Sequence, residues 1–102
     1  MRIAFTFRDM ETSNSLRDYG EEKISKLQRY FRAPMSVEVT ASVEKHRHCI
    51  DVNISADGEH FVGKENTEDM YASIDLVLDK LDRQIRRAKE TKTAQRRDAS
   101  HN

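Results

Sequence analysis

The chain has 102 residues, of which 36% are hydrophobic and 35% are charged, so it is expected to form one domain with a single thin core rather than a deep cleft between domains. Its 18 basic and 18 acidic residues cancel, and its one cysteine, Cys49, excludes an intrachain disulfide. No apolar run approaches the roughly 20 residues that span a bilayer, and residues 1–5 do not begin an apolar leader. We therefore expect a cytosolic protein.

The charges are distributed unevenly along the chain. Residues 1–50 carry 9 basic and 7 acidic side chains, residues 51–79 carry 1 and 8, and residues 80–102 carry 8 and 3, which gives local balances of +2, −7 and +5. The local charge changes sign at Lys80, inside one helical pattern, and this indicates that the basic end of the helix faces a polyanion. A solvated helix with opposite charges on its two halves is the alternative interpretation.

The first part of the chain predicts a strand followed by a helix. Apolar and polar residues alternate over residues 2–8, as in a half-buried strand. Residues 12–14 are all N-cap types, and an apolar stripe from Leu16 to Phe31 predicts a helix through about residue 30, which Pro34 ends. Gly20 lies on this stripe and indicates a close approach of the helix to a sheet.

Three further strands are predicted in the middle of the chain. Residues 37–44 and 49–55 alternate in the same way, so each forms a strand with one wet face, joined by a basic turn near residues 45–47. Asp57-Gly58 is a strong hairpin signal. A shorter strand is expected around residues 60–64.

The last predicted element is a long helix. Asn66 or Thr67 is expected to cap it, with the acidic residues 68–69 in its first turn. Its apolar stripe runs from Met70 to Ala88 at spacings of 3 and 4. Residues 91–102 lack periodicity and are expected to form a disordered tail.

The order β-α-β-β-β-α predicts an α+β fold for residues 1–90. The first crossover must be right-handed and makes the first two strands parallel, and the hairpins add two antiparallel strands. Both helices then cover the apolar face of a four-stranded mixed sheet and leave its other face to water.

An enzyme is not expected. The chain lacks a phosphate loop, a nucleophile elbow and a paired-cysteine motif. Residues 46–49 contain two histidines and Cys49, but adjacent strand residues point to opposite faces and do not form a metal site. The acidic residues of the long helix have no identifiable partner base. We therefore expect no metal, no cofactor and no small-molecule substrate.

The long helix sorts its charges by face. With Ile74 toward the sheet and about 100° per residue, the acids occupy one flank, whereas three bases occupy the outer face and the opposite flank. The acids are Asp75, Asp79 and Asp82, the bases are Lys80, Arg83 and Arg87, and Arg86 is an exception on the acidic side. A stack of i, i+4 ion pairs also produces such sorting.

The first helix contributes a second basic row, Lys23, Lys26 and Arg29. If the helices lie side by side, the two rows are expected to merge into one basic surface that tracks phosphates. The acidic flank of the long helix is expected to face away from that surface.

Particular segments carry a resemblance to a known family. Residues 69–75, Asp-Met-Tyr-Ala-Ser-Ile-Asp, and residues 78–85, Leu-Asp-Lys-Leu-Asp-Arg-Gln-Ile, resemble the short ribosome hibernation-promoting factors and their relative, ribosome-associated inhibitor A. The resemblance covers about residues 1–90 and includes Tyr30-Phe31 and Val43-Glu44-Lys45. It implies a fold similar to a double-stranded-RNA-binding domain.

The resemblance also implies a function. Family members bind the small ribosomal subunit and its rRNA in the channel for messenger RNA and tRNA, and they inhibit translation in starved or stationary cells. When the rRNA-binding role of the family is carried over to the matching positions of this sequence, it falls on Lys23, Lys26, Lys45, Lys80, Arg83, Arg86 and Arg87. The basic tail differs from the acidic tail of the inhibitor branch. A stand-alone RNA-binding or regulatory module, for example one that modulates a sigma factor, is the alternative, and ribosome dimerisation is left open.

Overall fold

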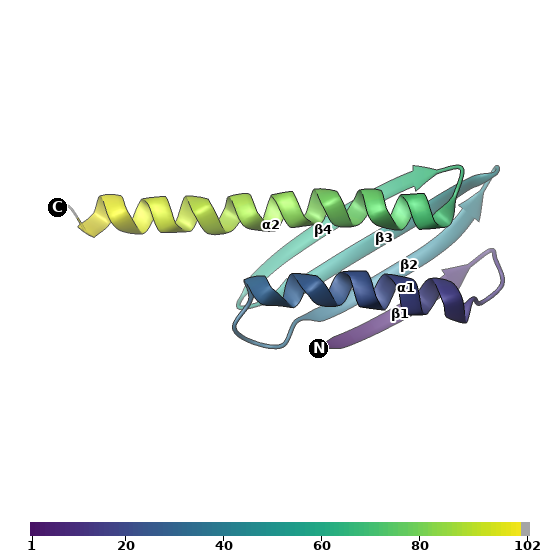
Figure 1. Cartoon of the computed structure of the whole chain (residues 1–102), viewed down its shortest axis with the longest axis horizontal. Helices are drawn as coiled ribbons and strands as arrows, with labels where there is room; N and C mark the ends of the chain where they lie inside the picture. Colours follow the sequence, from purple (N-terminus) through teal and green to yellow (C-terminus); the bar gives the residue numbers. More distant parts are fainter. Residues whose placement is uncertain (101–102) are drawn as a thin grey trace.

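A computed structural model describes residues 1–100, with side chains through residue 91. The chain forms one sheet and two long helices, and a short 3₁₀ helix, η1, directly continues the first (Figure 1). The elements in chain order are β1 (Arg2–Arg8), α1 (Asn14–Ser25), η1 (Lys26–Tyr30), β2 (Ser36–Glu44), β3 (Arg47–Ala56), β4 (Glu59–Thr67) and α2 (Met70–Ser100).

The sheet has the strand order β1-β2-β3-β4. β1 is parallel to β2, and the two hairpin pairs are antiparallel. Both helices lie on one face, with α2 packed on β3 and β4 and α1 over the β1 side (Figure 1). The α+β fold predicted from the sequence is therefore confirmed.

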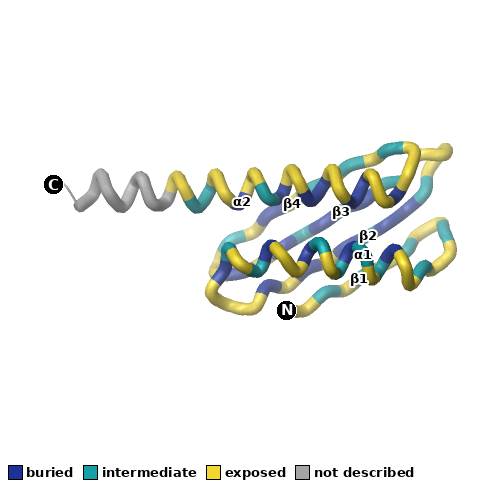
Figure 2. The backbone as a smooth tube through the Cα atoms, viewed as in Figure 1, coloured by how far each residue is buried: buried dark blue, intermediate teal, exposed yellow. Residues whose placement is uncertain are grey.

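The core is the layer between the sheet and the helices. Alternate strand residues face this layer, so that Phe5, Val39, Val52 and Gly63 form one row across the sheet. The apolar stripes of both helices lie over such rows and are buried (Figure 2). Because the other side chains of each strand point to the opposite face, that face stays polar.

Two glycines bring the helices close to the outer strands. A Cβ on Gly20 of α1 would lie 2.8 Å from a ring carbon of Phe5, and a Cβ on Gly63 of β4 would lie 2.9 Å from Val77 and 3.0 Å from Leu81. The close approach expected at Gly20 is confirmed. Gly63 does the same on the sheet side, under α2.

The first helical stretch ends at Tyr30, as expected, although its last turns are 3₁₀ rather than α-helical. Ser13 caps α1, because its hydroxyl accepts a hydrogen bond from the Leu16 amide at 3.2 Å. The loop that follows is tied to the β3–β4 turn, since the Asp57 carboxylate accepts hydrogen bonds from the amides of Arg32 and Ala33. Two backbone hydrogen bonds hold the pKa of Asp57 below its usual value.

Both predicted hairpins are present. Lys45 and His46 form the β2–β3 turn, and Asp57 and Gly58 form the β3–β4 turn, with positive φ at all four residues, as type I′ turns require. The fourth strand is longer than expected, because β4 pairs with β3 as far as Thr67.

The helix α2 differs from its prediction at both ends. Asp69, rather than Asn66 or Thr67, caps it, because the Asp69 carboxylate accepts a hydrogen bond from the Ala72 amide at 3.1 Å while Thr67 still belongs to β4. The tail expected over 91–102 is helical through Ser100 (Figure 1). This stretch contains no glycine or proline, so the established helix propagates although the sequence has no apolar stripe there. Residues 101–102 lie outside the described residues.

Truncating the buried stripe of α2 tests this packing. Ile74 and Leu81 are 1% and 0% exposed, so Ile74→Ala or Leu81→Ala is expected to lower the free energy of unfolding by about 2–5 kcal/mol through the cavity each leaves. Urea denaturation measures the change. Leu76→Ala, on the exposed side of the same helix, is the control and should change stability by less than about 1 kcal/mol. Equal stability of all three variants would contradict the observed packing.

Candidate nucleic-acid interface

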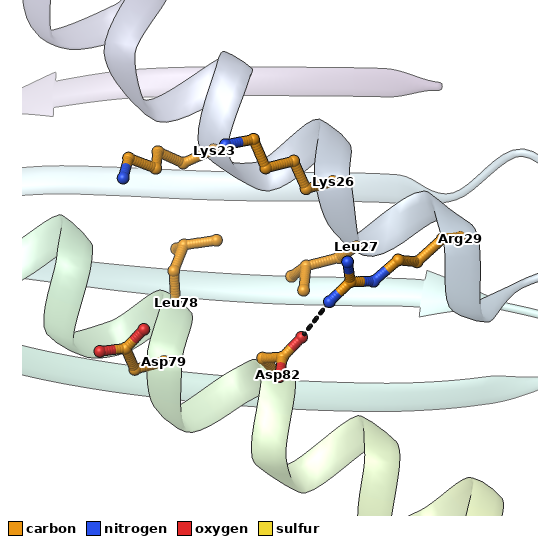
Figure 3. A pocket seen from close by; sticks show the side chains of 7 residues that line it. All are labelled: Lys23, Lys26, Leu27, Arg29, Leu78, Asp79 and Asp82. Atoms are coloured by element: carbon orange, nitrogen blue, oxygen red, sulfur yellow. Dashed lines mark hydrogen bonds and ion pairs between the residues drawn. The ribbon is translucent and has the colours of Figure 1, made fainter.

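The basic row of the first helix faces α2. Ile24 and Leu27 are buried against the core, and Lys23, Lys26 and Arg29 line the space between the helices. Figure 3 shows the Arg29 side chain crossing to Asp82 of α2, whereas the Lys26 side chain runs back along the first helix toward Lys23. The row expected from the i, i+3 spacing therefore exists. It continues from α1 into η1 without interruption.

The acidic flank of α2 faces this row. The Lys23 ammonium lies 3.7 Å from an Asp75 carboxylate oxygen, and the Arg29 guanidinium lies 3.1 Å from Asp82. The expectation that the acids face away from the basic surface is wrong. The helical periodicity places the acids on one flank, but the neighbour of that flank depends on the order of the helices on the sheet.

Two tyrosines strengthen the bridges between the helices. The Tyr19 hydroxyl donates a hydrogen bond to Asp75 at 2.5 Å, and the Tyr30 hydroxyl donates one to Asp82 at 2.6 Å. The hydrogen bond from Tyr30, together with the Arg29 guanidinium, holds the pKa of Asp82 below its usual value. The hydrogen bond to the charged Asp75 raises the pKa of the Tyr19 hydroxyl.

The sequence alone does not predict the two bridges between the helices. Their partners are separated by 52 to 56 residues along the chain, so no local spacing links them. In the sequence, Tyr30 stands out only as part of the Tyr30-Phe31 segment that carries the family resemblance, and no motif singles out Tyr19. Their position on the side of α1–η1 that carries Lys23 and Arg29 is the one available signal.

The outer side of α2 carries the second basic row. Lys80, Arg83 and Arg87 line a hollow of about 300 Å³ together with Gln84. All three bases are exposed, as the periodicity predicted. Lys80 pairs with Glu65 of β4, whereas no described side chain pairs with Arg83 or Arg87.

The predicted site residues form two surfaces and one separate position. The acidic flank lies between the two basic rows, so the rows do not merge as expected. Arg86 lies on the acidic side, 3.8 Å from Asp82. Lys45 lies in the β2–β3 turn, at the end of the sheet where α2 begins, and is remote from Arg87, which is about five helical turns further along α2.

Two other kinds of site are absent among the described residues. No three histidine, cysteine, aspartate or glutamate side chains in that part of the chain approach one another closely enough to hold a metal ion. Neither helix combines, over the residues described, the length and apolar composition that crossing a bilayer requires.

Comparison with known proteins identifies the family. Residues 3–93 match the family described as sigma 54 modulation protein / S30EA ribosomal protein. The chain belongs to this family. A ribosome hibernation promoting factor of Azotobacter vinelandii is 42% identical over 90 residues, which cover 88% of this chain and 84% of the relative. The Escherichia coli K12 protein of that name is 33% identical, over 88% of this chain and 95% of the relative.

Solved structures of similar proteins have the same fold. The N-terminal domain of Thermus thermophilus protein Y superposes with a TM-score of 0.80 at 28% identity, over 85% of this chain and 98% of that domain. A ribosomal subunit interface protein of Coxiella burnetii gives 0.76 at 23% identity, over 88% and 99% of the two chains, and supports the fold alone. The family resemblance expected from the sequence is confirmed, and ribosome hibernation is the function for which the curated relatives are named.

The Asp82 bridge predicts a pH-dependent contribution to stability. Because folding lowers the pKa of Asp82, its stabilisation is complete above the ordinary aspartate pKa of 3.8 and is lost as the pH falls through the lower value of the folded state. At pH 7, Asp82→Asn is expected to lower the free energy of unfolding by about 1 kcal/mol. The difference from the parent should shrink below pH 3.8. Chemical denaturation at a series of pH values measures both quantities.

Asp79→Asn is the matched control for this experiment. Asp79 lies on the same flank of α2 but no described side chain pairs with it, so the change should stay within about 0.5 kcal/mol at every pH. A constant deficit of Asp82→Asn at all pH values would contradict the role given to the carboxylate charge.

Proposed function

We propose that this protein is a ribosome hibernation factor that binds the small ribosomal subunit and its rRNA in the channel for messenger RNA and tRNA. It acts in the cytoplasm, inhibits translation during starvation or stationary phase, and catalyses no reaction. The observation that carries this proposal is the family match over residues 3–93, with relatives named ribosome hibernation promoting factor at up to 42% identity. The unit that binds is residues 1–90.

The charge arrangement supports binding to RNA. Arg83 and Arg87 are exposed, carry no described ion pair and line one hollow, which suits them to phosphate oxygens. Lys26 is exposed in the first basic row. Lys23, Arg86 and Lys80 already have carboxylate partners, so they add less to the positive potential. Lys45, at the hairpin, is a separate contact.

The alternative is modulation of a sigma factor, which the description of the family also names. The two functions predict different partners. A pull-down with the tagged protein from stationary-phase cells, followed by probing for ribosomal subunits and for sigma 54, separates them. Recovery of sigma 54 without ribosomal subunits would favour the alternative.

Removing the two unpaired arginines of α2 tests the proposed interface. Arg83→Gln/Arg87→Gln is expected to weaken co-sedimentation with small subunits roughly 10- to 30-fold near 0.15 M salt and to reduce the salt slope by about one unit per lost contact. Stability should change by no more than about 0.5 kcal/mol per position, because both side chains are exposed. Inhibition of a cell-free translation reaction should weaken in parallel.

Arg2→Gln/Lys64→Gln is the matched control. It removes the same two positive charges from exposed positions on the sheet face opposite the helices. Equal affinities of the two double variants for small subunits would show that net charge, rather than the outer face of α2, determines binding.

A further inference from the structure

A groove runs between the two helices. The bridges from Tyr19 and Lys23 to Asp75 close it at one end, and those from Tyr30 and Arg29 to Asp82 close it at the other. The hollow between them has a volume of about 300 Å³ (Figure 3). This volume lies at the lower end of the range for small-ligand pockets.

The walls of the groove differ in chemistry. Leu27 and Leu78, which are 3% and 7% exposed, lie between the helices and form its apolar floor (Figure 3). Asp79 projects from the α2 side and Lys26 belongs to the α1–η1 side. No described side chain forms a hydrogen bond or ion pair with either, so each is available to a ligand.

The proposed function places RNA phosphates on both sides of this groove. A phosphate is repelled by the Asp79 carboxylate, so the part of the RNA that enters must be uncharged. An apolar floor suits the face of a base, and RNA is read through unpaired bases whose edges form hydrogen bonds. Lys26, on the opposite wall, is suited to the phosphate of the nucleotide that enters.

We propose that the groove binds one unpaired guanine nucleotide of the RNA, with the base on Leu27 and Leu78 and its Watson–Crick edge donating hydrogen bonds to Asp79. This inference rests on the proposed function and adds a base-reading site to it. Guanine fits because its N1–H and N2 amino group are adjacent donors, which match the two oxygens of a carboxylate. Adenine, cytosine and uracil each place a ring or carbonyl acceptor beside their donor, and that acceptor faces the carboxylate unfavourably.

Short RNAs with one variable base test the site. The probes are fluorescently labelled 11-nucleotide oligouridylates with guanine, inosine, adenine or cytosine at the centre, titrated with the full chain and followed by fluorescence anisotropy. The guanine RNA is expected to bind roughly five- to tenfold more tightly than the adenine RNA. Inosine lacks the N2 amino group alone and should lose about two- to fivefold.

Three variants assign this preference to residues. Asp79→Ala should abolish the preference for guanine while oligouridylate binding persists, whereas Lys26→Gln should weaken binding of all four RNAs alike. Glu38→Ala removes the same charge as Asp79→Ala from the opposite face of the sheet and should keep the preference. All three positions are exposed, so folding is expected to be unaffected, and circular dichroism checks this.

Several outcomes would overturn the inference. These are equal binding of the guanine and inosine RNAs to the parent, a guanine preference that survives Asp79→Ala, and binding to none of the RNAs. Co-sedimentation with small subunits tests the proposed function separately. Ribosome binding by the parent without any base preference would reject the guanine site and leave the proposed function standing, whereas a base preference without ribosome binding would do the reverse.

Discussion

One apolar layer between the sheet and the helices holds this chain together, and both helices must lie on the same face to complete it. The described core residues form a single cluster within that layer. Gly20 and Gly63 let the helices approach the outer strands, and α1 and α2 lie side by side on one face of the sheet (Figure 1). The facing flanks of the helices are then close enough for their charged side chains to meet.

The contact between the helices divides the charged side chains of this overall neutral chain into those with a partner and those without one. The carboxylates Asp75 and Asp82 are engaged by tyrosines and bases of the first helix, and Glu65 engages Lys80. Partly exposed ion pairs of this kind add little stability each, but they determine which charged side chains have a partner. The cations left without a described partner include Lys26, Arg83 and Arg87, and they are the side chains that the proposed function assigns to RNA phosphates.

The resulting surface consists of two basic rows separated by the acidic flank of α2. Such a surface does not suit a phosphate backbone laid straight across both helices, because the carboxylates in the middle repel it. It suits an RNA that bends or exposes a base between two phosphate contacts, which folded RNA does more readily than a uniform duplex. Under the proposed function, this arrangement connects the charge pattern of the helices to recognition of a shaped RNA.

The sequence by itself determined the fold class, the strand order, the hairpins and the exposure of the bases on α2, because these follow from local periodicity, turn residues and the handedness of the crossover. It also carried the family resemblance, in the Asp69–Asp75 segment. Tertiary structure alone decided which flank of α2 faces α1, and so which bases are paired, because contacts such as Tyr30 to Asp82 join residues 52 positions apart. The helical end of α2 was missed for a related reason: a helix that extends past the core needs no apolar stripe, so periodicity gives no sign of it.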